Sequence, residues 1–155
     1  LLMDVINDYL PSPLDRGPKA GIIPGTEDKM ERSPDPGEPF SAVVFKTIAD
    51  PYSGKLTVLR VYSGTVSQDG SFYNVTKSTK ERYGQLLQVA GREQNGVPKA
   101  GPGDIVAVAK LKETATGDTL CDESNKIQFE TIEPLPTLVS YAIEPKSKKD
   151  FQHSY

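Results

Sequence analysis

Residues 40–66 read FSAVVFKTIADPYSGKLTVLRVYSGTV, and this stretch decides what kind of fold the chain can form. Two runs rich in β-branched and aromatic residues, at 40–49 and 55–66, flank a cluster of turn-forming residues that includes Pro51 and Gly54. Such side chains favour the pleated, half-buried surface of a strand, whereas Pro and Gly favour tight turns. The stretch therefore predicts a β-hairpin whose turn contains Pro51 and Gly54.

The same signals predict the remaining strands. SFYNVT follows a hairpin-type turn, ERYGQLLQVA spans 81–90 with Gly84 as a bulge or bend, and IVAVAKLK follows a loop rich in Pro and Gly. A turn at Gly117 and Asp118 precedes a last predicted strand, KIQFETIE at 126–133. Roughly six short strands without intervening helices predict an antiparallel barrel or sandwich, because parallel strands need long crossovers. IVAVA alone would also suit a buried helix, but the turns around it favour a strand.

The N-terminal tail differs from the strand region. Residues 1–10, LLMDVINDYL, place apolar side chains at helical spacing, and Pro11 ends that pattern. Because the apolar stripe runs from the first residue without a capping residue, we expect that the chain was cut from a larger protein within a helix. The alternative is a short amphipathic helix that packs on its own domain. Residues 11–37 are rich in Pro and Gly, which predicts an extended linker leading to a domain at 38–133.

The C-terminal tail is predicted to belong to a further domain. Pro134 and Pro136 interrupt the chain, and TLVSYAIEP at 137–145 has the composition of one more strand with no partner after it. We expect 134–155 to be a linker and a lone strand, at which the chain is truncated. Unpaired edge strands are a route to dimers, so we would regard a dimer formed through this strand as an artefact.

Composition limits the class of protein and its compartment. The 155 residues suffice for one domain with its own core, and 36% hydrophobic and 25% charged residues are typical of a globular protein. The chain has neither an apolar run near the ~20 residues of a membrane span nor a signal peptide. Cys121 is the only cysteine, which fits a reducing compartment, and we expect a cytoplasmic protein without a membrane partner. The net charge of −3 neither supports nor excludes nucleic acid.

Motifs for catalysis and for phosphate binding are incomplete. Cys121 and His153, the only Cys and His, cannot supply a structural zinc site, and we regard them as a strand-end thiol and a tail residue, not as a nucleophilic pair. The segment Ser53-Gly54-Lys55-Leu56 lacks two positions of the phosphate-binding loop, and Gly101-Pro102-Gly103 lacks the third Gly of the dinucleotide fingerprint. We predict that this chain has no catalytic residue, no metal site and no cofactor site.

A small basic run is the one feature that points to a partner. Lys80 and Arg82 are two residues apart, so they project from one face of a strand, with Lys77 just before them. Lys55 and Arg60, on the neighbouring hairpin arm, are predicted to extend this patch. Clustered Lys and Arg suit the phosphates of a nucleic acid. The alternative is a solubilising face into which Glu81 is mixed.

Several segments together resemble, in order, successive segments of bacterial translation elongation factor G. They are DYLPSPLD, FKTIADPYSGKLTVLRVYSGTV, YNVTKSTKER, AGPGDIVAVAKLKETATGDTL and VSYAIEPKSK. The resemblance implies that 38–133 is the second domain of that family, a six-stranded antiparallel closed barrel, with Gly117 and Asp118 in a turn that shapes the barrel end. Residues 1–10 would be the last helix of the GTP-binding domain, and 137–146 the first strand of the third domain.

The resemblance also implies a function. Full-length members of the family hydrolyse GTP and drive the movement of tRNA and mRNA through the ribosome, and GTP and Mg²⁺ would bind in the upstream domain. The barrel would pack on that domain and touch small-subunit rRNA, with Lys77, Lys80 and Arg82 as contacts. VAGREQ at 89–94 replaces a Met-His-Ala-Asn-like segment of the family and is more similar to elongation factor G-like paralogues. The alternative is therefore a purely structural spacer barrel in a paralogue with a specialised role.

Overall fold

The computed structural model describes residues 1–50, 54–91 and 93–131 of the chain. Within them, two helices precede a series of strands, and the helices are α1 (Leu2–Tyr9) and α2 (Pro13–Arg16). The strands are β1 (Lys19–Ile22), β2 (Lys29–Arg32), β3 (Ser41–Asp50), β4 (Gly54–Ser63), β5 (Val66–Ser67), β6 (Gly70–Asn74), β7 (Thr79–Tyr83), β8 (Leu86–Ala90), β9 (Glu93–Val97), β10 (Lys99–Ala100), β11 (Ile105–Ala109) and β12 (Thr119–Cys121).

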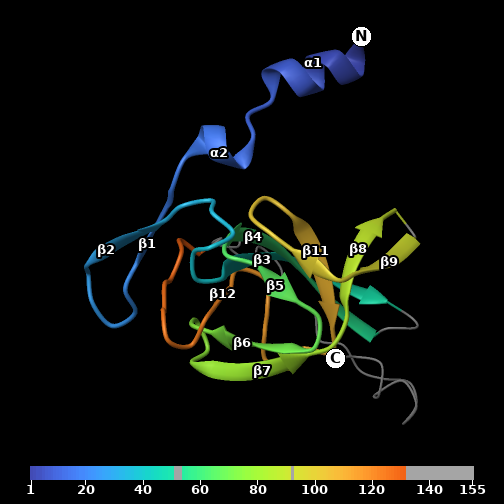
Figure 1. The fold of residues 1–155 in the computed structure, drawn as a ribbon. Coiled ribbons are helices and arrows are strands. Elements are labelled where there is room, and N and C mark those ends of the chain that lie inside the picture. The colour runs from blue at the N-terminus through green and yellow to red at the C-terminus, as the bar shows by residue number, and fades with distance from the viewer. Residues whose placement is uncertain (51–53, 92, 132–155) are drawn as a thin grey trace, which may run out of the picture.

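One antiparallel sheet of eight strands dominates the fold. Its order is β7-β6-β12-β3-β4-β11-β8-β9, and it curls into a half-barrel (Figure 1). The β3–β4 hairpin lies at its centre and shifts register between Ser41 and Ala42 and again between Val44 and Lys46. Such bulges bend a strand and increase its twist. The hairpin predicted at 40–66 is therefore also the element that curls the sheet.

The two ends of the sheet approach each other through the residues around β5. Asp69 N donates a hydrogen bond to Gly84 O at 2.9 Å, just beyond β7, and Gln68 N donates to Pro98 O at 3.3 Å, between β9 and β10. β5 itself pairs with β10. The all-β antiparallel prediction is confirmed for the described residues. The ladder order ends at β7 and β9, however, so closure into a six-stranded barrel stays a prediction.

The inner face of the curled sheet holds the main core. Phe72 is 2% exposed and stacks between Phe40 and Tyr83, with ring centroids 5.2 and 3.9 Å away. Burying one large apolar side chain contributes about 1.5–3 kcal/mol relative to leaving it in water. The aromatic stack packs with fully buried aliphatic side chains from β3, β4, β11 and β12, namely Ala42, Val44, Leu59, Val61, Val108 and Leu120.

The outer face of the same sheet carries a second, smaller core. The β1–β2 hairpin and residues 126–130 cover it, and we call these two segments the outer layer. Ile22 and Gln128 join them through two backbone hydrogen bonds of 2.8 and 2.9 Å. A Cβ at Gly21 would lie 2.7 Å from Gln128 O, so only glycine permits this approach. The buried members of the second core are Val43, Val75, Cys121, Ile127 and Phe129.

The N-terminal segment has more structure than the sequence predicts. The helix expected at 1–10 is present as α1, and Leu10 takes up the extended conformation before Pro11. The extended linker expected at 11–37 contains instead α2 and the β1–β2 hairpin. None of its prolines lies within β1 or β2, so the missing N–H interrupts no ladder, and Pro13 begins a helix that Ser12 caps.

Two strand predictions are also wrong. The single strand expected at 81–90 is two strands, β7 and β8, which stand near opposite ends of the sheet order because the chain turns after Tyr83. The last strand of the sheet is not at 126–133 but is β12, only three residues long. Within 126–131 the backbone forms one isolated bridge, and its apolar side chains cover the outer face. Pro51, the strand predicted at 137–145, and any dimer formed through it lie outside the described residues.

The glycine that follows β4 offers a test of the central hairpin. Gly64 and Gly54 both have positive φ, +69° and +73°, so alanine is strained at each by about 1–2 kcal/mol. A Cβ at Gly64 would also lie 2.6 Å from Glu38 O and from the Phe40 backbone, whereas the space at Gly54 is open. We expect Gly64→Ala to lower the free energy of unfolding by roughly 1–3 kcal/mol more than Gly54→Ala does, measured by urea denaturation. Equal losses would contradict the close packing seen at Gly64.

Candidate nucleic-acid interface

The β6–β7 hairpin presents the predicted basic run to solvent. Lys80 and Arg82 are exposed on β7, and the residues between and beside them are partly buried, so the two cations share the outer face as predicted. Their cross-strand partners on β6 are Tyr73 and Ser71. Lys77 lies exposed in the turn, where its backbone N–H donates to Asn74 Oδ1 at 3.0 Å. We call Lys77, Lys80, Arg82 and Tyr73 the β7 face.

Acidic side chains beside the β7 face reduce its positive charge. Lys80 Nζ lies 2.6 Å from Glu123 Oε2, and the hydrogen bond from Lys80 lowers the pKa of the Glu123 carboxyl. Asp122 and Glu123 line a shallow depression of about 440 Å³ together with Tyr73 and Lys80. Lys126 adds a cation that the sequence did not single out, with its Nζ 4.1 Å from the centroid of the Tyr73 ring. The face is therefore of mixed charge.

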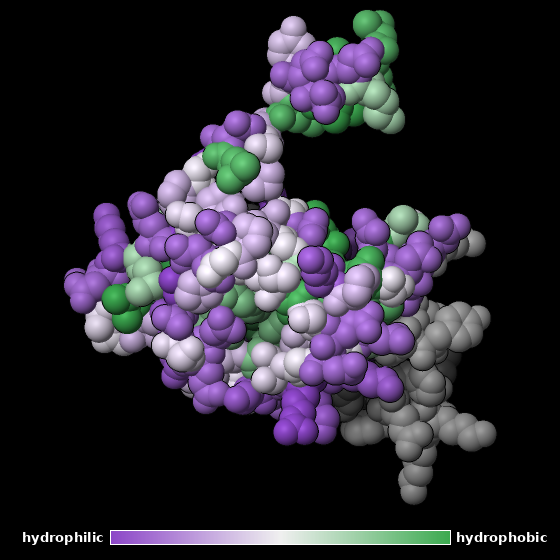
Figure 2. Space-filling model, in the orientation of Figure 1, coloured by the Kyte–Doolittle hydropathy of each residue, from purple (hydrophilic) through white to green (hydrophobic). Residues whose placement is uncertain are grey.

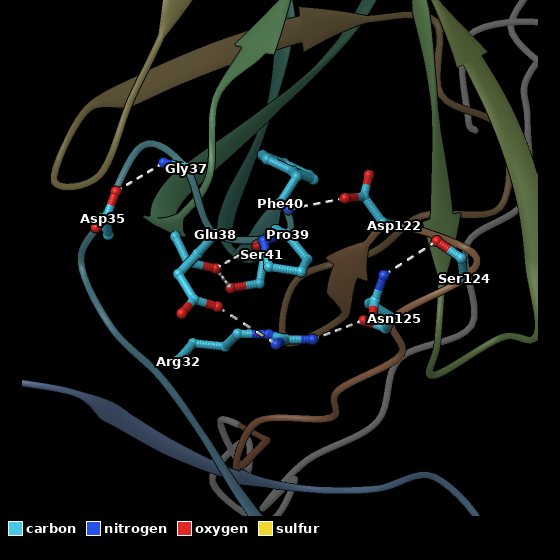
Figure 3. A network of polar contacts seen from close by, with 11 residues as sticks. Arg32, Asp35, Gly37, Glu38, Pro39, Phe40, Ser41, Asp122, Ser124 and Asn125 are labelled. Carbon is cyan, nitrogen blue, oxygen red and sulfur yellow. Dashed lines mark hydrogen bonds and ion pairs between the residues drawn. The ribbon is translucent and has the colours of Figure 1, made fainter.

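The turn that carries these acids is held by the outer layer. Arg32 on β2 is buried, and its Nη2 donates to Asn125 O at 3.0 Å while its Nη1 lies 3.6 Å from Glu38 (Figure 3). At the other end of the turn, Asp122 accepts a hydrogen bond from Phe40 N at 2.9 Å (Figure 3). The position of Glu123 beside Lys80 thus depends on β2, a strand that the sequence did not predict.

Lys55 and Arg60 do not simply extend the β7 face. Lys55, near the start of β4, donates from Nζ to Thr114 O, in the loop that Glu81 of β7 also contacts. Arg60 is separated from β7 by β6, β12 and β3 in the sheet order. Its guanidinium lies 5.8 Å from the centroid of the Tyr62 ring, and Lys19 lies 5.6 Å from the same ring. Arg60 therefore belongs to a separate basic group.

Glu81, which the sequence presents as one charge in a mixed face, joins β7 to the loop after β11. Its carboxylate accepts hydrogen bonds from the backbone N–H groups of Lys112, Glu113 and Thr114 and from the Thr114 hydroxyl. Partial burial raises the pKa of Glu81, but these hydrogen bonds outweigh it, so the pKa lies below its ordinary value of 4.5. Glu81 is thus a structural clamp.

The turn predicted at Gly117 and Asp118 follows the loop that Glu81 holds and leads into β12. Gly117 has a φ of +93° and donates from N to Val44 O at 2.8 Å. Asp118 is buried and accepts from Asn74 Nδ2 and from Ala115 N, each at 2.8 Å. The buried carboxylate therefore has partners, as buried charges require. This network fixes one end of the curled sheet.

The lone cysteine lies in the core of the sheet. Cys121 is buried, and burial raises the pKa of its thiol, which disfavours the reactive thiolate. In residues 1–50, 54–91 and 93–131 no group of three His, Cys, Asp or Glu side chains is placed to hold a metal ion. None of the helices there is long and apolar enough to cross a membrane. His153 lies outside the described residues.

Comparison with known proteins assigns the strand region to a family. The family model for elongation factor G domain 2 matches residues 39–123, which include β3 to β12. The chain belongs to the elongation factor G domain 2 family. The matched residues carry the β3–β4 hairpin, the β7 face and the Glu81 clamp, whereas the β1–β2 hairpin and residues 126–130 lie outside the match.

A solved structure resembles a larger part of the chain. A protein from Thermus thermophilus is 25% identical, with a TM-score of 0.59 over 81% of this chain. The similar region is 16% of that protein, so this chain spans only a small part of its length. The resemblance recognised in the sequence to domain II of elongation factor G is confirmed by the family match over residues 39–123.

The Glu81 clamp yields a pH-dependent prediction. Because its pKa is lower in the folded protein, the carboxylate stabilises the fold above the unfolded-state pKa near 4.5, and this stabilisation is lost as the pH falls through the folded-state pKa. We expect Glu81→Gln to lower the free energy of unfolding by about 1–3 kcal/mol at pH 7, and the difference from the wild type to shrink below pH 4.5. Chemical denaturation across pH measures both. Glu113→Gln, in the same loop, is the control, and an equal loss in that variant would contradict the clamp.

Proposed function

We propose that this chain is a non-catalytic β module of a cytoplasmic translational GTPase, which helps to hold the parent protein on the ribosome. The observation that carries the proposal is the family match over residues 39–123. On this view GTP and Mg²⁺ bind in another domain of the parent, and the parent acts in GTP-dependent translocation during protein synthesis. We further expect the curled sheet to close as a barrel between its two end strands, β7 and β9, where the residues around β5 join them.

The β7 face is the surface we propose for small-subunit rRNA. Lys77, Lys80 and Arg82 are exposed on one hairpin, and Tyr73 lies beside them. Cations on a hairpin can neutralise several phosphates at once, and the released counterions make such binding steeply dependent on salt. The ion pair with Glu123 would have to open or be shared, which favours modest affinity for the isolated domain.

α1 is the part that we propose packs on the GTP-binding domain of the same parent. It stands apart from the sheet, with its apolar side chains on the surface (Figure 2). Leu2, Met3 and Tyr9 are each at least 70% exposed, and Val5 and Ile6 are also on the surface. An amphipathic helix with an uncovered apolar face marks an interaction site.

A second candidate function is that of a structural spacer without RNA contact, in an elongation factor G-like paralogue. The Lys80–Glu123 ion pair and the nearby Asp122 favour it, because they lower the positive charge of the β7 face. In the first candidate function the cations of the β7 face contact rRNA, and in the second they do not. Reversing their charge therefore distinguishes the two.

Charge reversal on the β7 face should weaken binding to small ribosomal subunits. We expect the chain carrying Lys77→Glu, Lys80→Glu and Arg82→Glu to bind small subunits at least roughly tenfold more weakly. Its affinity should also depend less on salt, with a slope of log affinity against log salt that is about 2–3 less negative. Co-sedimentation with small subunits over a salt series measures this. The control is Lys29→Glu, Lys46→Glu and Lys99→Glu, which changes the same net charge elsewhere. Indistinguishable affinities of the two triple variants, both folded by circular dichroism, would favour the spacer.

Removing the acid that pairs with Lys80 should strengthen binding to small ribosomal subunits. Glu123→Gln frees the Lys80 ammonium for a phosphate, so we expect affinity for small subunits to rise roughly two- to fivefold at low salt. Glu93→Gln, on β9, makes the same change in net charge and is the control. An unchanged affinity in Glu123→Gln would show that Lys80 does not meet a phosphate.

A further inference from the structure

Two neighbouring cavities lie between the outer layer and the central strands, and both are lined by Lys19, Arg60 and Tyr62. The smaller has a volume of about 220 Å³ and is walled by α2, the residues leading into β1, and β4. The larger, about 510 Å³, extends past Tyr62 over exposed parts of β3 and β11. We call them the cationic cavity and the apolar cavity.

The cationic cavity is lined by four basic side chains and, among its described lining residues, by no acidic one. These are Arg16, Lys19, Arg32 and Arg60. They come from α2, β1, β2 and β4, so the fold brings Arg60 of the central hairpin beside three cations of the N-terminal segment. Charges of one sign in a concave site concentrate ions of the opposite sign. The cavity is therefore suited to an anion.

Two of the four basic side chains that line the cationic cavity carry a buried nitrogen without a hydrogen-bond partner. In the described part of the chain, three buried side-chain polar atoms have no hydrogen-bond partner, and two of them are Arg32 Nε and Arg60 Nε. Both arginines line the cationic cavity. Arg32 is already held in place through its other nitrogens by Asn125 and Glu38 (Figure 3). Buried donors normally have a partner, so these two guanidinium groups are incompletely satisfied beside the cavity, and arginine is a side chain that commonly recognises phosphate.

The apolar cavity offers a surface for a planar group attached to that phosphate. Phe45 is 38% exposed and Ile105 is 51% exposed, and both line it together with Phe129 and Tyr62. Aromatic side chains beside a basic groove are the usual platform on which bases stack. Glu130, the one acidic residue in this lining, can accept a hydrogen bond from an exocyclic amine.

We propose that the two cavities together form a nucleotide site, with the phosphate in the cationic cavity and the base in the apolar cavity. The ligand is a phosphate ester of an aromatic base, either a free nucleotide or one residue of a single-stranded RNA. The site uses none of Lys77, Lys80 and Arg82, so it does not depend on the rRNA-binding surface proposed above. It gives Arg60 a role apart from the β7 face.

Binding of AMP and of inorganic phosphate to the whole chain, measured by calorimetry, tests the site. We expect AMP to bind at least roughly tenfold more tightly than phosphate, because only AMP covers the apolar cavity. Arg16→Gln with Lys19→Gln should weaken both ligands roughly tenfold, whereas Phe45→Ala should weaken AMP alone. Arg60→Gln, in the wall shared by both cavities, should weaken both ligands. Lys99→Gln with Lys112→Gln is the charge-matched control.

A fluorescein-labelled single-stranded decaribonucleotide distinguishes the two sources of the nucleotide. Tighter binding of this strand than of AMP, with competition between them, would assign the site to RNA, and AMP binding without competition would assign it to a free nucleotide. The proposal is overturned if AMP binds no more tightly than phosphate, or if the Arg16 and Lys19 double variant, folded by circular dichroism, binds as the control does. Neither result depends on how the β7-face variants bind ribosomal subunits.

Discussion

The rest of the structure depends on burial of both faces of the β3–β4 hairpin. Its inward side chains, such as Val44 and Leu59, pack in the main core, while Val43 points to the opposite face and is also buried. The two bulges curl the hairpin around the aromatic stack of Phe40, Phe72 and Tyr83. A central hairpin that is apolar on both sides needs a cover outside the curled sheet. The β1–β2 hairpin and residues 126–130 provide this cover.

That cover determines where charge lies on the surface. It carries Arg32, which holds the turn with Asp122 and Glu123 beside the β7 face, and it carries Lys19, which lies beside Arg60 and Tyr62. Two groups of cations consequently form around one apolar layer. Lys80 of the first is paired with Glu123, whereas the second lines a cavity whose described lining holds no acidic residue, although Arg32 also contacts Glu38. Phosphate-binding strength depends on such neighbours as much as on the number of Lys and Arg residues.

A network of polar groups joins β6, β7 and the loop after β11 at the sheet end that carries the β7 face. Asn74 donates to Thr114 and to Asp118, and the Thr114 hydroxyl donates to Glu81. Backbone N–H groups of the loop after β11 complete the network. Fully satisfied networks of this kind specify one arrangement, because any partly broken alternative leaves a buried polar group unpaired. Lys80 and Arg82 are therefore presented from a strand that this network holds in one position.

The sequence by itself determined the antiparallel β character, the central hairpin, the N-terminal helix, and the shared face of Lys80 and Arg82, because strand alternation, helical spacing and turn chemistry are local properties. It also identified the family, through several segments that resemble the family in order. It did not locate β12, the split at Gly84 or the β1–β2 hairpin, since three-residue strands and Pro-rich hairpins have weak local signals. Only the tertiary structure decided that Glu123 pairs with Lys80, that Glu81 is a clamp, and that Arg60 joins Arg16, Lys19 and Arg32. Each of these links residues far apart in the sequence, and only the curl and outer cover of the sheet bring them together.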